Sequence, residues 1–274
     1  MEGTAKDYDT LCGIKHYPYT QSALDSHFPS MEWSDEDVIL DIGCGPGRIT
    51  KNILLPKCPK LKKIVAIDID PNYIEYAGKT YFHEKIEYKT QNILEKLDPE
   101  EVGKYDKVVS FHAFHLIPDY EKLFSVISSL LKPGGHFFFI IISNFRIFSI
   151  IRDLSTDKEW TKHIKAEDLL ALLPPTVFWE DVETEFKNFV SKFDLRVTNI
   201  KCHTLKSSYP NKKHCLDMTL ALFPRTIFEN LEPEVKDYLW KQAQPTVFKH
   251  STQEENGEIS VSFEVLQVSG KKET

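Results

Sequence analysis

The chain lacks the cysteine patterns and the basic excess that mark metal sites and nucleic-acid surfaces. Its five cysteines among 274 residues are odd in number, and none stands at CxxC spacing or at metal-ligand spacing to a histidine. This scatter predicts reduced thiols in a cytoplasmic protein, without a metal site. The formal net charge of -7 argues against a broad basic face, so we expect no nucleic-acid partner.

Long apolar runs are also missing. The longest, HFFFIIISNFRIFSII from His136, is interrupted by Asn144 and Arg146, whereas a membrane helix needs about 20 apolar residues. The first ten residues, MEGTAKDYDT, are polar and acidic, unlike a signal peptide. We therefore expect a cytoplasmic protein with no membrane partner.

Between about residues 36 and 142, short apolar runs alternate with amphipathic stretches. The runs are rich in β-formers and nearly continuous, which is typical of parallel strands covered on both faces. They lie at 38–42, 63–69, 85–90, 105–111 and 136–142. The segment LKPGG (131–135) reads as a helix end, a turn and the entry into the next strand, at 136–142. The pattern predicts an α/β fold with a mainly parallel sheet.

The rhythm changes after residue 143. Residues 145–190 are rich in aromatics and read as helical, 195–208 return to strand character, and 212–249 read as helical again. Near the C-terminus, apolar and polar residues alternate over 258–271, as expected of a final strand. We predict that the second half completes the sheet and inserts helices into it, without forming a separate domain. Such an insertion usually shapes a substrate pocket.

The segment ILDIGCGPGRIT (39–50) carries three glycines directly after an apolar run. A glycine-rich turn between a strand and a helix lets a ligand lie against the backbone. A P-loop requires Lys followed by Ser or Thr, and Arg48 stands here instead. The even spacing DxGxGxG departs from the GxGxxG of dinucleotide folds. An ordinary tight turn remains an alternative.

The second predicted strand favours a nucleotide ligand. Asp68 lies near the end of the run VAIDID, about 20 residues after Gly47, where an acid can accept hydrogen bonds from both ribose hydroxyls. Asp70 precedes Pro71 and is expected to cap the following helix. The glycine loop together with Asp68 is more specific than either feature alone.

Five segments within residues 36–142 form a set: VILDIGCGPGRIT, IVAIDID, YKTQNILE, YDKVVSFHAFHLI and LLKPGGHFFFII. They occur in the order and spacing of class I S-adenosylmethionine-dependent methyltransferases, and the sequence resembles that family. The resemblance implies a Rossmann-like fold with a seven-stranded, mostly parallel sheet, helices on both faces and an antiparallel last strand. It also implies S-adenosyl-L-methionine as the cofactor, lying across the strand ends.

The same resemblance assigns the cofactor-binding residues. Asp41 would orient the loop or meet the cofactor's ammonium group, and Asp68 would hold the ribose. The remaining contacts would be with the methionine part (Gly43, Cys44, Gly45, Ser110, Phe111, His112) and with the adenine (Ile69, Asn92, Ile93).

Four further segments extend the resemblance over more of the chain: FHAFHLIPDYEKLF, SNFRIFSIIRDLSTDKEW, IKCHTLKSSY and EISVSFEVLQVSGKK. With them the sequence resembles the insect juvenile hormone acid and farnesoic acid O-methyltransferases. That family methylates the carboxylate of a long terpenoid acid, so the resemblance implies a small apolar acid as the substrate. Aromatic residues of the helical insertion would wall its pocket, or would simply pack the insertion onto the sheet. They are Phe145, Phe148, Trp160, Phe178 and Trp179.

Two acceptor contacts of that family are altered. In the family, an N-terminal Gln and a Trp directly after the strand-four His hold the acceptor carboxylate. Here Leu116 follows His115. Tyr19 stands where the Gln aligns, with Gln21 nearby, so the N-terminal substrate contact is Tyr19 or Gln21.

His115 is the candidate catalytic residue. It follows the fourth strand, where acceptor and sulfonium should meet, and would donate a hydrogen bond to the acceptor or act as a base toward a hydroxyl. Methylation of another small-molecule hydroxyl or amine is one alternative. A non-catalytic S-adenosylmethionine-binding protein and a dehydrogenase on a similar fold are the others.

The predicted organisation has two parts. An N-terminal helical segment, 1–35, covers the active site, and a methyltransferase domain occupies 36–274. Within it, the cofactor core is 36–142, the helical insertions are about 145–190 and 212–249, and the last strand is about 258–268.

Overall fold

The computed structural model describes residues 5–10, 14–223, 225–228 and 231–274. It divides into two compact units, and the unit boundaries fall inside three strands. The first unit comprises Met1–Ile141, Glu180–Cys202 and Leu266–Thr274; the second comprises Ile142–Trp179 and His203–Val265. The second unit contains the predicted helical insertion 212–249 and most of the predicted insertion 145–190.

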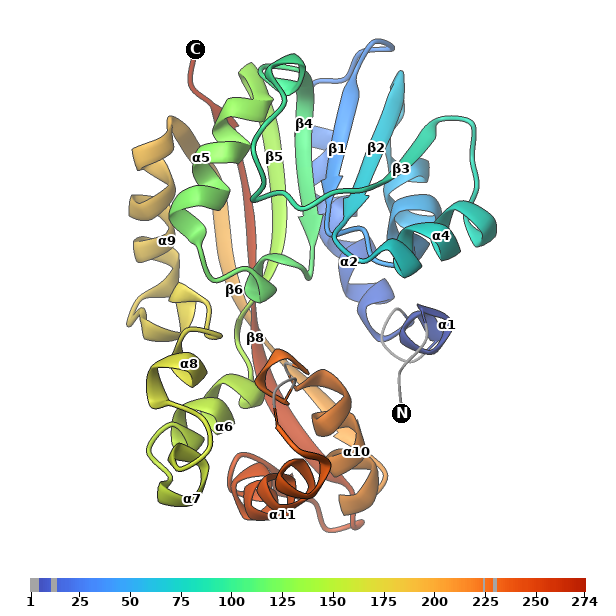
Figure 1. The fold of residues 1–274 in the computed structure, drawn as a ribbon. Helices are drawn as coiled ribbons and strands as arrows, with labels where there is room; N and C mark the ends of the chain where they lie inside the picture. The colour runs from blue at the N-terminus through green and yellow to red at the C-terminus, as the bar shows by residue number, and fades with distance from the viewer. Residues whose placement is uncertain (1–4, 11–13, 224, 229–230) are drawn as a thin grey trace. The chain divides into compact units, whose positions relative to one another are not determined.

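The strands form one sheet in the order β3-β2-β1-β4-β5-β8-β6 (Figure 1). Strand β1 pairs in parallel with β2 and β4, β2 with β3, and β4 with β5. The strands are β1 Val38–Ile42, β2 Lys63–Asp68, β3 Ile86–Thr90, β4 Tyr105–Phe111, β5 Leu131–Asn144, β6 Leu195–Tyr209, β7 Thr252–Gln253 and β8 Ile259–Lys272. The Rossmann-like prediction is confirmed, with the two-residue β7 beside β8 as an eighth strand.

The last long strand runs antiparallel to its neighbour β6. The hydroxyl of Thr198 donates to the carbonyl of Ser269 at 3.2 Å, and the N–H of Glu273 donates to the carbonyl of Asp194 at 2.8 Å. Residue numbers therefore increase along β6 while those of the facing residues in β8 decrease, so the two strands are antiparallel. This agrees with the predicted antiparallel last strand, which extends to Lys272 rather than 268.

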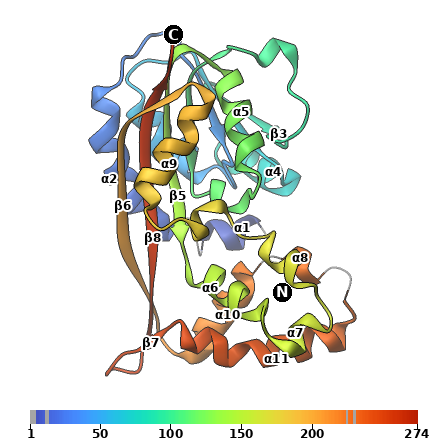
Figure 2. The ribbon, with the colours of Figure 1, turned by 90° about the vertical axis from the view of Figure 1, so that its left-hand side faces the viewer.

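Helices cover both faces of the sheet in the first unit. Successive side chains of β5 point to opposite faces, and each of the two faces meets a different helix. The Phe139 ring lies 6.0 Å from Phe124 of α5 (Tyr120–Leu130). The Phe138 ring lies 6.0 Å from Phe28, just after α2 (Ile14–His27). Figure 2 shows α5 and α2 on opposite sides of the sheet.

The remaining helices of the first unit are short or lie beside the sheet. Helix α4 follows β2, and α9 packs its aromatic side chains on α5, where the Phe186 ring lies 5.5 Å from Phe124. Their bounds are α1 Ala5–Tyr8, the π-helix η3 Thr50–Leu54, α3 Leu55–Lys57, α4 Pro71–Thr80, α9 Val182–Val190, and the 3₁₀ helices η2 Phe28–Ser30, η4 Pro99–Glu101, η5 Phe114–Leu116 and η7 Ser191–Phe193.

The entry into β5 differs from the prediction. Residues 131–135 were expected to contain a separate turn, but α5 ends at Leu130 and β5 begins at Leu131. The pairing with β4 shifts between Tyr105 and Lys107, so this segment is an irregular strand start. Such a bulge accommodates the Pro–Gly–Gly sequence without leaving the sheet.

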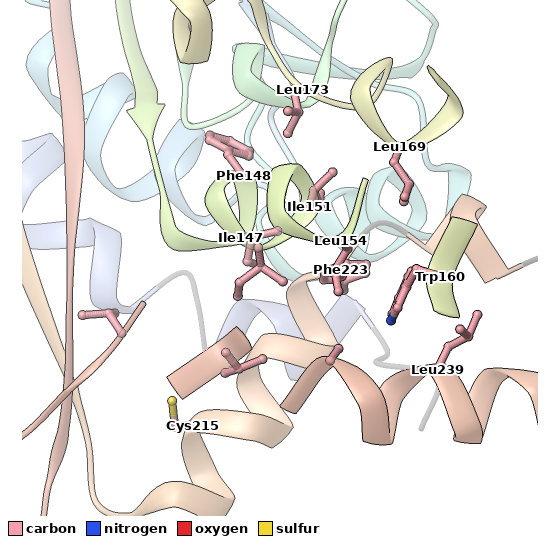
Figure 3. Close-up of a cluster of buried hydrophobic side chains, with 14 of the residues drawn as sticks. Ile147, Phe148, Ile151, Leu154, Trp160, Leu169, Leu173, Cys215, Phe223 and Leu239 are labelled. Atoms are coloured by element: carbon pink, nitrogen blue, oxygen red, sulfur yellow. The ribbon is translucent and has the colours of Figure 1, made fainter. Parts of the chain in front are cut away.

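The second unit has its own apolar core (Figure 3). Trp160 is completely buried, and its ring lies 6.2 Å from both Phe223 and Phe228. The guanidinium of the buried Arg146 donates to the thiol and carbonyl of Cys215, which ties α6 to α10. The helices are α6 Arg146–Leu154, α7 Lys158–Thr161, α8 Ala166–Leu170, α10 Lys212–Leu222, α11 Pro233–Lys249, and the 3₁₀ helices η6 Pro175–Phe178 and η8 Arg225–Phe228.

This core explains why the chain divides. The side chains of 142–179 and 203–265 pack on one another around Trp160, which a pattern of local periodicity does not reveal. Helix α9 lies in the first unit. Within the described ranges, no helix combines the length and apolarity needed to cross a membrane.

Gly270 offers a test of the packing between β8 and its neighbours. A Cβ there would lie 2.2 Å from the Arg196 carbonyl oxygen and 2.3 Å from Cζ of Phe137. We expect Gly270→Ala to lower the free energy of unfolding by about 1–3 kcal/mol because a packed interior cannot yield easily. Urea denaturation followed by circular dichroism measures the change.

Gly78 in α4 is the matched control, because a Cβ there meets nothing within 4 Å. Gly78→Ala should raise the stability by about 0.5–1 kcal/mol through the helix preference of alanine. Equal urea midpoints for the two variants would contradict this packing.

Candidate cofactor and acceptor site

The glycine loop follows β1, and its three glycines have different reasons to be there. All three have positive φ angles, of 72°, 54° and 88° for Gly43, Gly45 and Gly47. A Cβ on Gly43 would lie 2.3 Å from Cβ of Ala113, and one on Gly47 would lie 2.8 Å from Cβ of Ala77. A Cβ on Gly45 meets nothing within 4 Å. Internal packing therefore requires two glycines, and Gly45 leaves open space for a ligand.

Backbone bonds fix the loop against the end of β2. The N–H groups of Gly43 and Cys44 both donate to the Ile67 carbonyl, at 2.8 and 3.0 Å. Cys44 is buried, and its thiol points to the Gly45 carbonyl at 3.6 Å. The loop is thus preorganised by its own chain before any ligand binds.

Asp68 joins the loop to the second strand. Its carboxylate accepts the Gly45 N–H at 2.8 Å and the Asp70 N–H at 3.0 Å. A carboxylate offers about four lone-pair sites, so two backbone donors leave capacity for ribose hydroxyls. Burial raises the pKa of Asp68. The predicted helix cap is confirmed, because Asp70 accepts the N–H of Asn72 at 2.8 Å.

Asp41 is the other carboxylate at this edge and is 1% exposed. The Thr50 hydroxyl donates to its Oδ2 at 2.7 Å, while its Oδ1 has no hydrogen-bond partner in the described part of the chain. Burial raises its pKa to about 7, against the lowering effect of the Thr50 hydrogen bond. An orphaned carboxylate oxygen of this kind fits the ammonium group of S-adenosylmethionine.

The three residues predicted to contact adenine differ in their exposure and in their hydrogen bonding. Ile69 is 65% exposed and presents an apolar surface, whereas Ile93 is buried. The side-chain oxygen of Asn92 accepts the N–H of Leu94 at 3.0 Å, so it already closes a local turn. Ile69 is therefore well suited to cover a flat ring, and Asn92 is partly committed to its own loop.

The end of β4 holds the three residues predicted beside the methionine part. Ser110 is fully buried and donates to the Ile42 carbonyl at 2.8 Å, which joins β4 to β1. Phe111 is also buried. His112 has a φ of 57° and donates its N–H to the Ile140 carbonyl at 2.8 Å. A left-handed conformation at a non-glycine residue costs about 1–3 kcal/mol and is often found at functional sites.

Helix α2 carries two polar side chains to this point. The Thr20 hydroxyl hydrogen-bonds Nε2 of His112 at 3.1 Å, and both groups are buried. The Tyr19 ring centroid lies 6.4 Å from that of His112. Burial raises the pKa of Tyr19 to about 12, against the opposing hydrogen bond from Gln267. Gln21 is exposed, so Tyr19 is the side chain that faces the end of β4.

Sequence reasoning missed Thr20 and Gln267. Thr20 could have been noticed, because it lies with Ala23 and Leu24 at helical spacing on the buried face of α2. Gln267 lies in an apolar strand of the sheet, and nothing local indicates that it meets Tyr19.

Asp9 is a third residue that sequence reasoning missed, and no local signal indicates it. Its buried carboxylate accepts two hydrogen bonds from Arg48, at 2.7 and 2.9 Å. It also accepts the hydroxyls of Tyr81 at 2.7 Å and Tyr76 at 3.3 Å. The segment Ala5–Thr10 is therefore bound to the residue that follows the glycine loop and to α4.

The predicted substrate residues lie in different surroundings. His115 is partly buried in η5, and Leu116 beside it is 70% exposed. Phe145 and Trp160 belong to the second unit. Phe145 packs on Phe148, and Trp160 lies wholly inside the apolar core. Their assignment to a substrate pocket stays a prediction. In the part of the chain that the structure describes, no cluster of His, Cys, Asp or Glu suits a metal ion.

Comparison with known proteins gives consistent matches. The family described as "Methyltransferase domain" matches residues 40–139. The chain is 27% identical over 219 residues to the juvenile hormone acid O-methyltransferase of Bombyx mori, covering 79% of this chain and 78% of that protein. It is 25% identical over 206 residues to the Drosophila melanogaster protein of the same name, covering 73% of this chain and 69% of that one.

A solved structure described as a methyltransferase of Bacillus halodurans shares the fold. It aligns with a TM-score of 0.60 at 17% identity, over 92% of this chain and all of that one. This likeness supports the Rossmann-like fold described above.

Replacing Asp68 tests the ribose contact. We expect Asp68→Ala to weaken S-adenosylhomocysteine binding at least tenfold, since hydrogen bonds to a charged group are worth about 1.5–3 kcal/mol each. Asp70→Ala is the control, because it removes a neighbouring carboxylate that only caps α4. Isothermal calorimetry should detect the loss for Asp68 alone; equal affinities in both variants would exclude the contact.

The pH dependence of cofactor binding tests Asp41. With a pKa near 7, its carboxyl group is mostly neutral at pH 6 and mostly ionised at pH 8. The ionised form attracts the ligand's ammonium group, so the affinity for S-adenosylhomocysteine should rise about tenfold over this range. Asp41→Asn should flatten the profile. A wild-type affinity that stays constant from pH 6 to 8 would rule out Asp41 as the ammonium contact.

The same raised pKa has a consequence for the protein without its cofactor. The unfolded chain ionises Asp41 near the ordinary value of 3.8, before the folded chain does. The contribution of Asp41 to stability therefore falls as the pH rises from about 4 to about 7. Bound cofactor should oppose this fall.

Fold, loop and sequence matches all lead to one enzyme class. The chain is an S-adenosylmethionine-dependent methyltransferase with a methyltransferase domain at 40–139, and it is similar to the juvenile hormone acid O-methyltransferases over most of its length.

Proposed function

We propose that the enzyme transfers the methyl group of S-adenosylmethionine to the carboxylate of a small apolar acid, of the juvenile hormone acid or farnesoic acid type. The extent of the resemblance supports this substrate class. The match to the Bombyx mori protein spans 219 residues, more than twice the span of the methyltransferase domain at 40–139. The similarity therefore extends beyond the cofactor core, into the segments that we expect to select the acceptor.

The chemistry of Tyr19 carries the choice of a carboxylate. With a pKa of about 12, its hydroxyl stays protonated near neutral pH, so it can donate a hydrogen bond but cannot remove a proton. A carboxylate needs no general base, because it is already ionised at neutral pH. A hydroxyl acceptor would require one. A donor at the end of β4 therefore suits an anionic acceptor better.

The bound cofactor supplies a methyl group on a sulfonium, which is already an activated leaving group. The protein has to orient the acceptor oxygen in line with that methyl group and exclude water. In this proposal His115 and Tyr19 donate hydrogen bonds to the acceptor carboxylate.

A panel of acceptors tests the proposal. Purified protein with methyl-labelled S-adenosylmethionine is offered long-chain apolar acids, phenols, alcohols and amines of similar size. We expect labelled methyl esters from the acids alone. Product from alcohols, phenols or amines but not from acids would replace the carboxylate by another acceptor. In that case His115 would be the candidate base.

His115→Ala should lower kcat for the best acid about a hundredfold, because misplacing an acceptor by about 1 Å has an effect of that size. The affinity for S-adenosylhomocysteine should stay within twofold of wild type. His163→Ala is the control, since His163 is exposed and belongs to the second unit. If His115→Ala retains full turnover, the residue is structural.

A further inference from the structure

Thr20 is a fully buried polar residue on the apolar face of α2. Its neighbours on that face, Ala23 and Leu24, are 2% and 0% exposed. A buried hydroxyl must be hydrogen-bonded to avoid a substantial desolvation cost. Thr20 meets this requirement through Nε2 of His112, at 3.1 Å, although the two residues are far apart in the sequence.

Other hydroxyls of the same N-terminal segment behave differently. Thr10 donates to the Lys6 carbonyl at 2.8 Å, and Ser26 donates to the Ser22 carbonyl at 3.0 Å. Each bonds the carbonyl four residues earlier, which is the usual local solution in a helix. The bond from Thr20 to an imidazole on another element is therefore a specific contact between α2 and the end of β4.

The backbone of His112 is fixed independently. Its φ is 57°, and its N–H donates to the Ile140 carbonyl of β5. The next residue, Ala113, lies against Gly43 of the glycine loop, at a separation that leaves no room for a Cβ on Gly43. The Cα of His112 is thus held beside the loop, and the side-chain torsions set where the ring points. The Thr20 hydrogen bond constrains those torsions.

We propose that Thr20 is a positioning residue for methyl transfer, whose buried hydroxyl holds the His112 imidazole at the cofactor loop. The turnover part of this inference rests on the proposed function, whereas the contact itself does not. Thr20 is fully buried and would act through His112, its hydrogen-bond partner. Through this bond the placement of α2, which also carries Tyr19, is linked to the orientation of a ring beside the methionine site.

Three variants separate positioning from packing. Thr20→Val keeps the shape and removes the hydroxyl, and Thr20→Ser keeps the hydroxyl and removes a methyl group. Thr10→Val is the control, because it removes a hydroxyl of the same segment that bonds only its own turn. His112→Asn removes the imidazole with a residue that tolerates a positive φ. Thermal unfolding by circular dichroism verifies that each variant is folded.

Two readouts follow each variant. The first is kcat and KM with the best acceptor, together with the affinity for S-adenosylhomocysteine. The second is the ¹⁵N spectrum of the histidine rings, in which the His112 signals are those lost in His112→Asn. Nitrogen chemical shifts report the tautomer and hydrogen bonding of the ring.

We expect Thr20→Val to lower kcat about tenfold, with S-adenosylhomocysteine affinity within twofold of wild type, and to move the His112 signals. Thr20→Ser should restore both, and Thr10→Val should change neither. Thr20→Val in the His112→Asn background should cause no further loss, because the two residues act as a unit.

Full turnover in Thr20→Val, or a Thr20→Ser variant as impaired as Thr20→Val, would overturn the inference and leave Thr20 as a packing residue. If the wild-type protein methylates no acceptor of the panel, the proposed function fails and the ring signals decide alone. Signals that move in Thr20→Val and return in Thr20→Ser then support the positioning contact; unmoved signals overturn it.

Discussion

The hydrogen bond from the Gly45 N–H to the Asp68 carboxylate joins the loop after β1 to the end of β2. The loop lies directly on the sheet through the bonds from Gly43 and Cys44 to Ile67. Ala113 and Ala77 close against the flanking glycines, so the loop has little freedom to move. The open side of Gly45, the exposed face of Ile69 and the orphaned oxygen of Asp41 consequently keep fixed positions for a nucleotide ligand.

The carboxylates of Asp68 and Asp41 at this edge differ in their hydrogen bonding. Asp68 is bound by two backbone N–H groups and retains capacity for hydroxyls, whereas Asp41 is buried with one oxygen unsatisfied. A buried group without a partner is destabilising unless something compensates it. In our account the cofactor's ammonium group pairs with this oxygen. The unpaired oxygen therefore lowers the stability of the free protein and raises its affinity for the cofactor.

Much of this could be predicted from the sequence because the signals are local. Continuous apolar runs indicated β1, β2 and β4, the glycine loop marked the ligand side, and Asp70 before Pro71 indicated a helix cap. The packing of Trp160 on Phe223 and Phe228 was not predicted, since it joins segments that no periodicity connects. The contacts of Thr20 with His112 and of Asp9 with Arg48 were not predicted for the same reason. Ser110 was expected beside the methionine part, and its hydroxyl donates to the Ile42 carbonyl inside the sheet, a contact that a position at a strand end does not predict.

A crystal structure of the enzyme with S-adenosylhomocysteine at neutral pH is the most direct test of the central claim. Our account predicts the ligand's ammonium group within hydrogen-bond distance of Asp41 Oδ1, with its ribose hydroxyls on Asp68 and its adenine over Ile69. A ligand whose amino-acid end lies away from Asp41, with Oδ1 still unpaired, would contradict it.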